Sequence, residues 1–246
     1  MRLNGSFPPM EALVEHESPK AARILAVARE LVLKRGAKGV SIAEIAEKAH
    51  VGKGTIYLYW ATKEDLVLGL CARDFLAEID GFIVAFTEDP GVVLPRRFCV
   101  MLQQSAREHP FIRAIQYGDT DVLGVLTEHH NAQDLLSRFG FGAMLRVVLP
   151  VWRAHGMART DWVVREQAYA LQAVLAGFVE LDGAAAPGDV SSPEVLAATV
   201  DALLGSPSAE QHDVEAVAAE GLRLLDEART AVLDTIASTR ARQGQQ

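Results

Sequence analysis

The sequence predicts an all-α fold in which a small three-helix unit precedes a larger helical body. Apolar residues recur every three or four positions along most of the chain, which is the period of a helix buried on one face. No stretch alternates between apolar and polar residues, as a half-buried strand would. Near the N-terminus two short capped segments follow a longer one, and long segments follow them.

Composition indicates a globular protein with enough apolar surface for one large domain or two small ones. The chain has 246 residues, of which 50% are hydrophobic and 23% charged. It lacks the run of about 18 apolar residues that a membrane helix needs, and its N-terminus lacks the apolar core of a signal peptide. We therefore expect a cytoplasmic protein without a membrane segment. Its two cysteines, Cys71 and Cys99, are expected to be reduced core residues.

Charge is divided unevenly along the chain. The net charge is −8, yet residues 1–64 hold ten Lys and Arg against seven Asp and Glu, and residues 65–246 hold fourteen against twenty-five. Because binding to phosphate is driven by Lys and Arg, the overall charge argues against nucleic acid. The asymmetry instead predicts a basic N-terminal module carried on an acidic body.

Capping signals define the first four helices. The first covers 19–36, from a Ser-Pro start to a glycine, and the second begins at a capping box in residues 41–44. The third covers 53–60, and the fourth begins at another capping box in residues 62–65. Two short helices braced by a longer one have the geometry of a helix-turn-helix motif.

The remaining helices are longer, and no internal repeat is present. They are separated by loops rich in Pro, Gly and Asp. We expect them at 63 to about 87, 92–108, a short one from 110, 134–156 with a possible kink at Pro150, 161–182, 193–204 and 209–240.

The stretch VGKGTIYLYWATKEDL, residues 51–66, joins lysines, glycines and aromatic residues in a way that suits neither a core nor a solvated helix. Ile56 and Trp60 are four residues apart and are expected to be buried together. The opposite side of the helix then carries Lys53, Gly54, Tyr57 and Leu58. A lysine, a bare backbone and a tyrosine suit a groove wall of phosphates and sugars.

Lys53 and Lys63 both fall in the first turn of their helices, where a cation costs roughly 0.3 to 1 kcal/mol. A docked anion would explain both, because free N–H groups and lysines would converge on it. Ordinary solvated lysines are the alternative.

Residues 19–66 resemble the TetR family of bacterial transcriptional repressors. The resemblance rests on GVSIAEIAEKAHVGKGTIYLYWATKEDLVLGL, from the second helix into the fourth. It implies a helix-turn-helix DNA-binding domain at 19–66, preceded by a flexible arm at 1–18. Residues 67–246 would then form a helical domain for ligand binding and dimerisation.

The resemblance also implies which residues contact DNA. Phosphate contacts would come from Ser41, Lys53, Tyr57, Tyr59 and Lys63, and contacts at or near base edges from Gly54, Thr55 and Leu58.

Two positions depart from the family pattern. His50 stands where the family has glycine in the turn, and histidine tolerates left-handed backbone better than most residues. Gly52 replaces a small hydroxyl residue before the third helix, so it is a workable N-cap but lacks that contact. Trp60, in place of phenylalanine, is a conservative anchor.

The helical body carries no diagnostic motif. Most of its aromatic residues are expected to be core, but polar side chains beside them are typical of an apolar pocket that orients a ligand. The ligand candidates on this basis are Gln103, Gln104, Phe111, Gln116, Tyr117, Phe141, Trp152 and Gln172.

Residues 161–182 are too apolar for a helix exposed on one side of a monomer. With 193–204 they are expected to form a self-complementary dimer face that buries Val174, Phe178 and Leu181. Burial within the monomer core is the competing account.

Catalytic and metal signatures are weak. His129 and His130 are adjacent, so they point to different faces of a helix and do not form a metal pair. Ser105 and Ser137 have no visible base partner. We expect no enzyme activity, no metal and no cofactor.

The sequence thus predicts a homodimeric repressor that binds a palindromic operator in double-stranded DNA and is released by a lipophilic small-molecule effector. An activator, or a ligand-independent regulator with a filled body, is the first alternative. An enzyme or carrier built on the same helical body is the second.

Overall fold

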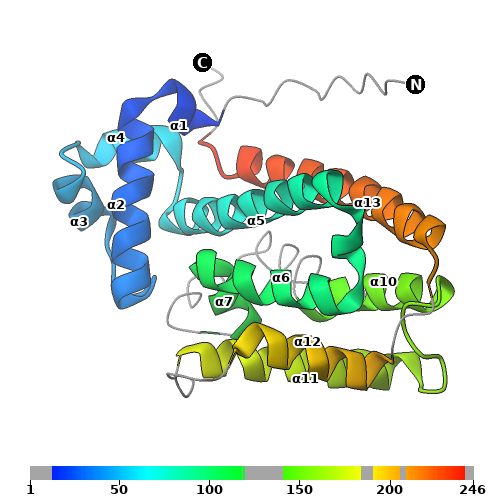
Figure 1. The fold of residues 1–246 in the computed structure, drawn as a ribbon. Coiled ribbons are helices and arrows are strands. Elements are labelled where there is room, and N and C mark those ends of the chain that lie inside the picture. Colours follow the sequence, from blue (N-terminus) through cyan, green and yellow to red (C-terminus); the bar gives the residue numbers. More distant parts are fainter. Residues whose placement is uncertain (1–12, 118, 120–140, 184–190, 206–208, 242–246) are drawn as a thin grey trace, which may run out of the picture.

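The computed structural model describes residues 13–117, 119, 141–183, 191–205 and 209–241 (Figure 1). Every regular element within these ranges is a helix, so the all-α prediction is confirmed. The N-terminal domain contains α1 (Val14–Glu17), α2 (Pro19–Arg35), α3 (Ile42–Lys48) and α4 (Lys53–Tyr59). The body contains α5 (Lys63–Glu88), η1 (Pro90–Val93), α6 (Pro95–Glu108), α7 (Pro110–Tyr117), α10 (Phe141–Ala154), α11 (Val164–Gly183), α12 (Ser192–Leu204) and α13 (Gln211–Ser238).

The expected N-terminal arm is ordered at its described end. Val14–Glu17 form a helical turn, and the Glu15 carboxylate accepts hydrogen bonds from Arg73 of α5, with Nη2 to Oε2 at 2.7 Å. Both side chains of this ion pair are largely buried. The arm is therefore attached to the body before α2 begins.

Two of the predicted caps behave differently. At α5 the Thr62 hydroxyl accepts from the Asp65 N–H at 3.0 Å, and the Asp65 carboxylate accepts from the Thr62 N–H at 3.1 Å, so the capping box is complete. At α3 the Ser41 hydroxyl accepts from the Glu44 N–H, but the Glu44 carboxylate pairs with Arg35 of α2 instead. This box is only half formed, because the arginine offers the carboxylate a charged partner.

α5 and α13 form the long axis of the molecule. In Figure 1, α5 leaves the N-terminal domain and runs between α13 on one side and α6 on the other, while α11 and α12 form the outermost layer. Gly221 of α13 permits a close approach to α5, since a Cβ at this position would lie 2.7 Å from a ring carbon of Phe86. A larger residue at 221 would separate the two helices.

Buried residues form two cores that meet along these two helices. The first core joins α2, α3, α4 and α7 to the first half of α5 and the end of α13. The second joins α6, α10, α11 and α12 to the last turns of α5 and the start of α13. Cys71 lies in the first core and Cys99 in the second, and both are buried free thiols whose pKa burial raises.

The end of α13 touches the N-terminal domain directly. The backbone N–H of Ala241 donates to the Tyr59 carbonyl at the end of α4, at 2.8 Å. Beside this bond, the backbones of Arg240 and Trp60 form an isolated antiparallel β-bridge. Chain segments about 180 residues apart in the sequence are therefore joined at the C-terminus of α4.

An ion pair also joins the N-terminal domain to the body. Arg29 of α2 pairs with Asp74 of α5, and its guanidinium lies 5.3 Å from the ring centroid of Phe111 in α7. Asp74 is buried, and its second oxygen also accepts from the Phe111 backbone N–H at 3.1 Å. One carboxylate thus holds α2, α5 and α7 together.

We predict that Asp74→Ala lowers the free energy of unfolding by about 3 kcal/mol, since it leaves a guanidinium and a buried backbone N–H without their acceptor. Asp80→Ala is the matched control. Asp80 also pairs with an arginine, Arg229, but the Asp80 side chain is 44% exposed, so water replaces part of the lost interaction and the loss should be smaller, about 1 kcal/mol. Urea denaturation of the three proteins measures both values, and equal losses would contradict the assigned role of Asp74.

Candidate nucleic-acid interface and internal cavity

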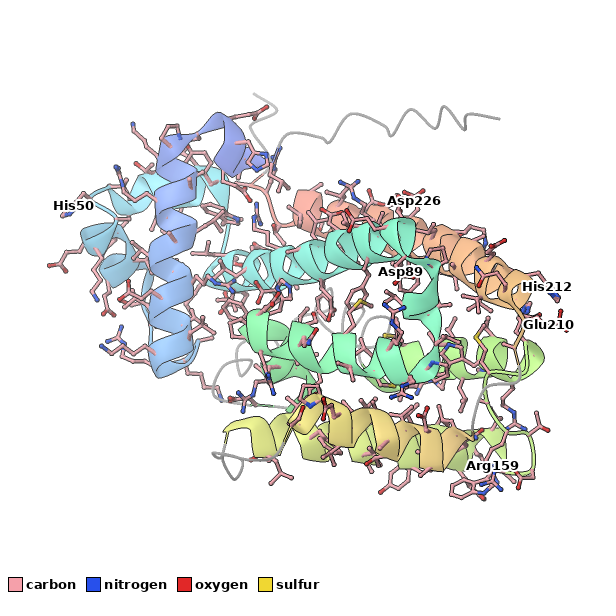
Figure 2. The ribbon with its side chains drawn as sticks, viewed as in Figure 1. His50, Asp89, Arg159, Glu210, His212 and Asp226 are labelled. Carbon is pink, nitrogen blue, oxygen red and sulfur yellow. The ribbon has the colours of Figure 1, made fainter. Side chains whose placement is uncertain are left out.

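The turn between α3 and α4 depends on one residue with left-handed backbone geometry. His50 has a φ of 52°, the only positive value at a non-glycine residue in the described ranges. Its N–H donates to the Glu47 carbonyl, and the Val51 N–H donates to the Ala46 carbonyl, which is the Schellman pattern of helix termination. Histidine therefore adopts the left-handed geometry expected of it. Figure 2 shows His50 on the side of the N-terminal domain that faces away from the body.

One side of α4 anchors it and the other is open. Ile56 and Trp60 are fully buried, as their spacing predicted. On the open side Tyr57 is 48% exposed and Leu58 is 69% exposed. The exposed side also includes Lys53 and Gly54, and a Cβ added at Gly54 would meet nothing within 4 Å.

Gly54 therefore has no packing reason to be glycine, although glycine weakens a helix by roughly 0.8 to 1 kcal/mol relative to alanine. A close approach of another molecule to the backbone is a physical reason for a bare position in the first turn of an exposed helix.

The other predicted contact residues occupy more constrained positions. Ser41 is exposed, but its hydroxyl caps α3. Thr55 is half-buried. The Tyr59 hydroxyl shares a hydrogen bond with the Ser18 hydroxyl at 2.7 Å, and its ring packs against Trp60. Tyr59 therefore fixes α4 to the start of α2, in addition to the phosphate contact predicted for it.

The Lys63 ammonium is hydrogen-bonded within the protein. It donates to the carbonyls of Ala37 and Val40, both at 3.1 Å, in the segment between α2 and α3. These bonds explain a lysine at the first turn of α5 without an anion. The side chain retains a third donor, so a phosphate contact stays a prediction, but the lysine also has a structural role that the sequence did not indicate.

The start of α4 lacks a side-chain cap. Gly52 is the N-cap residue, and no side chain accepts a hydrogen bond from the first turn of α4. The free N–H groups of this turn therefore remain beside Lys53, which leaves an electropositive end open to an acceptor.

The body encloses an apolar cavity of about 260 Å³ between α5, α6, α10 and α13. Phe82, Phe86, Phe98 and Trp152 supply aromatic faces, and Trp152 is held in place by its indole N–H, which donates to the Val93 carbonyl at 2.9 Å. The rest of the wall is mainly aliphatic.

Glu78 of α5 is the polar exception in this wall. The Ser105 hydroxyl of α6 donates to its carboxylate at 2.6 Å. Burial, together with the negative charge of Asp74 one turn earlier, raises the pKa of Glu78 to about 7, against the opposing effect of the Ser105 hydrogen bond. A carboxyl group in this wall therefore holds its proton to a much higher pH than usual.

The N-terminal domain matches a known protein family. Residues 24–70 match the model of the family described as bacterial regulatory proteins, tetR family. The N-terminal domain is thus a tetR-family domain. The match begins within α2 and ends in α5, so it contains both helices of the motif and the open side of α4.

Similar solved structures extend the likeness in fold to the helical body. The fatty acid metabolism regulator protein of Bacillus subtilis is 33% identical over 76 residues, which are 31% of this chain and 37% of that protein. The fatty acid degradation regulator FadR from Bacillus halodurans has a TM-score of 0.55 at 20% identity, covering 78% of this chain and 98% of that one. The reduced form of E. coli NemR has a TM-score of 0.52 at 18% identity, covering 78% and 100%. At these identities the solved structures show a shared fold.

The cavity of the helical body has a different wall from the one expected. Among the predicted ligand residues whose side chains the structure describes, only Trp152 lines it. Gln103 is buried away from it and donates to Ser192, Phe111 is buried in the first core, and Gln104 and Gln172 are exposed. The side chains of Gln116, Tyr117 and Phe141 lie outside the described residues.

Sequence reasoning missed Glu78, although a signal was present. Glu78 lies three residues after Phe75 and four before Phe82, so it falls on the apolar stripe of a long helix. An acid in such a stripe is a candidate for a buried functional group.

The residues predicted for a dimer face divide between two environments. Val174 and Phe178 are half-buried against the second core, and Leu181 is exposed. The first two therefore contribute to the monomer core. Across the described ranges no cluster of His, Cys, Asp or Glu is placed to hold a metal ion, and no helix there combines the length and apolarity needed to cross a membrane.

We predict that Glu78→Gln stabilises the protein increasingly as pH rises. Between the ordinary carboxyl pKa of 4.5 and the folded pKa of about 7, the folded state keeps a proton that the unfolded state has lost. Stability therefore falls over this window, and the loss is complete above pH 7. Glutamine does not ionise, so the variant should gain about 2 kcal/mol over the parent between pH 5 and pH 8 in urea denaturation. A difference that does not change with pH would contradict the burial of an ionisable Glu78.

Proposed function

We propose that the protein is a homodimeric transcriptional repressor that binds a palindromic operator through α4 and is released by a lipophilic small molecule. Regulators of the TetR family are DNA-binding transcription factors and not enzymes. The observation that carries the proposal is the open side of α4, where Lys53, a bare Gly54 and Tyr57 are exposed beside an N-terminus without a side-chain cap.

This surface suits the major groove of DNA. A helix placed in the groove brings its first residues to the base edges, and phosphates accept hydrogen bonds from lysines and free N–H groups. We propose that Lys53 and Tyr57 contact phosphates and that Gly54 and Leu58 lie near base edges. Two copies would then read half-sites about 34 to 36 Å apart, or a small multiple of that distance.

We propose that the outer side of α11 and α12 forms the dimer face. On α11, Tyr169 is 76% exposed and Leu181 is 65% exposed, and the smaller residues Ala173 and Gly177 are exposed between them at intervals of four. Val195 of α12 adds to the same layer. An exposed apolar stripe with small residues at its centre allows the same helix of a second copy to approach closely.

The cavity is joined to the DNA-binding domain by two helices. Both α5 and α13 line the cavity, α5 carries Asp74 that pairs with Arg29, and the chain after α13 bonds to Tyr59. We propose that a ligand favouring one arrangement of α5 and α13 changes the separation of the two α4 helices. Release requires that the ligand binds this state more tightly than the DNA-bound state.

The cavity also distinguishes the proposed repressor from a second candidate function, a regulator that works without a ligand. A ligand-independent regulator needs a filled body, whereas an apolar space of about 260 Å³ lies between α5 and α13. Apolar spaces of this kind are typical small-molecule sites. This observation favours the ligand-responsive repressor.

We predict that Lys53→Ala weakens binding to all duplex DNA nearly equally, because a phosphate contact carries no base information. Each lost contact flattens the slope of log K against log salt by about 0.9, so a dimer should flatten by roughly 1.8. The slope is measured by fluorescence anisotropy, on a duplex selected from random sequence and on an unrelated duplex. Lys53 suits this test better than Lys63, whose bonds to Ala37 and Val40 support the fold.

Arg223→Ala is the control for charge alone. Arg223 lies on α13 and pairs with Glu220 and Glu227, so its loss changes the net charge equally without touching α4. Its salt slope should match that of the parent. An unchanged slope for folded Lys53→Ala, or a slope altered as much by Arg223→Ala, would count against the DNA contact.

We predict that Gly177→Arg converts a dimer into a folded monomer. A Cβ at Gly177 meets nothing within 4 Å in the isolated chain, so the substitution leaves the protomer intact while placing a charge in the middle of the proposed interface. Gly81→Arg is the matched control, since Gly81 is an exposed helical glycine of α5 with equally open surroundings. Sedimentation velocity should show monomers for the first variant and dimers for the second. An unchanged dimer in both would place the interface elsewhere.

A further inference from the structure

Glu78 lies where an ionised carboxylate destabilises the fold unless a cation pairs with it. It lies in the cavity wall among Phe75, Ile79 and Phe82 of its own helix. An ionised carboxylate in apolar surroundings is destabilising unless it is hydrogen-bonded and paired with a cation. Glu78 occupies this position, although an apolar residue would fit the same stripe of α5 without the free-energy cost of burying a charge.

The hydrogen bonding of Glu78 is incomplete. The Ser105 hydroxyl donates to one oxygen at 2.6 Å. Among the residues that the structure describes, no other hydrogen bond or ion pair to this carboxylate is present. A carboxylate accepts up to about four hydrogen bonds, which leaves most of its capacity open.

The other charges around the cavity are also acidic. Glu220, at 43% side-chain exposure, is the second ionisable group in the described wall, and Arg223 pairs with it from outside that wall. Asp74, one turn before Glu78 on α5, already has its own partners in Arg29 and the Phe111 N–H. No lysine or arginine belongs to the described lining, so the wall offers a ligand negative potential.

The aromatic part of the wall suits a cation as well as an apolar group. The rings of Phe82 and Phe98 have centroids 5.9 Å apart, and Phe98 meets Trp152 edge to face at 5.6 Å. Such faces attract a cation through the ring quadrupole and also bury a hydrocarbon or an aromatic group.

We propose that the cavity binds a lipophilic amine whose protonated nitrogen pairs with the Glu78 carboxylate. The apolar part of the ligand lies against the aromatic wall, and the ammonium donates to the oxygen that Ser105 leaves free. This inference rests on the proposed function, because it names the chemical class of the effector. A carboxylate ligand is disfavoured, since it would meet two acids and no cation of the described wall.

The names of two similar proteins refer to fatty acids. The solved one is similar at 20% identity, which shows the fold alone, and the sequence relative is matched over 37% of its length. The wall of this cavity therefore points to a different ligand class from the one that those names suggest.

A matched series of probes tests the proposal. 4-Phenylbutylamine, 4-phenylbutanol and 4-phenylbutyrate share one apolar group and differ in the head group, and isothermal titration calorimetry on the full chain without DNA gives their affinities. The amine should bind at least about tenfold more tightly than the alcohol, as a charge-assisted bond would give, and the carboxylate should bind most weakly.

The variant Glu78→Gln should lower the affinity for the amine about tenfold or more and leave that for the alcohol within about threefold. Glu215→Gln is the control, because Glu215 is an exposed acid of α13 outside the described cavity wall, and its loss should change neither value by more than about threefold. The proposal is overturned if the amine does not bind, if the carboxylate binds as tightly as the amine, or if Glu78→Gln retains the preference. Because DNA is absent, these outcomes are separate from the salt-slope test of operator binding.

Discussion

The structure depends on one constraint, namely that α5 is a single 26-residue helix serving both hydrophobic cores. Its first turns are buried on every side, from Leu66 to Ala72, inside the N-terminal core. Its later turns supply Phe82 and Phe86 to the body and to the cavity wall. Because a helix is stiff along its axis, neither end can tilt without moving the side chains at the other end.

Two acidic residues of α5, Asp74 and Glu78, connect the helix to different parts of the molecule. Asp74 ties the helix to Arg29 of the DNA-binding domain, and Glu78 enters the cavity one turn later. The two carboxylates repel each other, which contributes to the raised pKa of Glu78. A change of charge at Glu78 therefore acts within one helical turn of the contact that holds α2.

α13 provides a second physical connection. It packs along α5 through the close approach at Gly221, and its C-terminal end delivers the Ala241 N–H to Tyr59. The C-terminal end of α4 is thus held by a segment that begins in the cavity wall, while its N-terminal end has no side-chain cap. Such an arrangement fixes the direction of α4 and leaves its exposed side open.

The sequence by itself determined the elements and the outer side of α4, because these follow from local rules. The Thr62 capping box, the left-handed turn at His50 and the burial of Ile56 with Trp60 depend on neighbours within a few residues. Features that depend on residues far apart in the sequence were decided by the tertiary structure. The Lys63 ammonium donates to a carbonyl between α2 and α3, and Phe178 packs against the second core. The cavity is lined by Glu78 and not by Gln103 or Phe111. Periodicity shows which side of a helix is apolar, but only the packing of the other helices shows whether that side meets a core, a second copy or an open space.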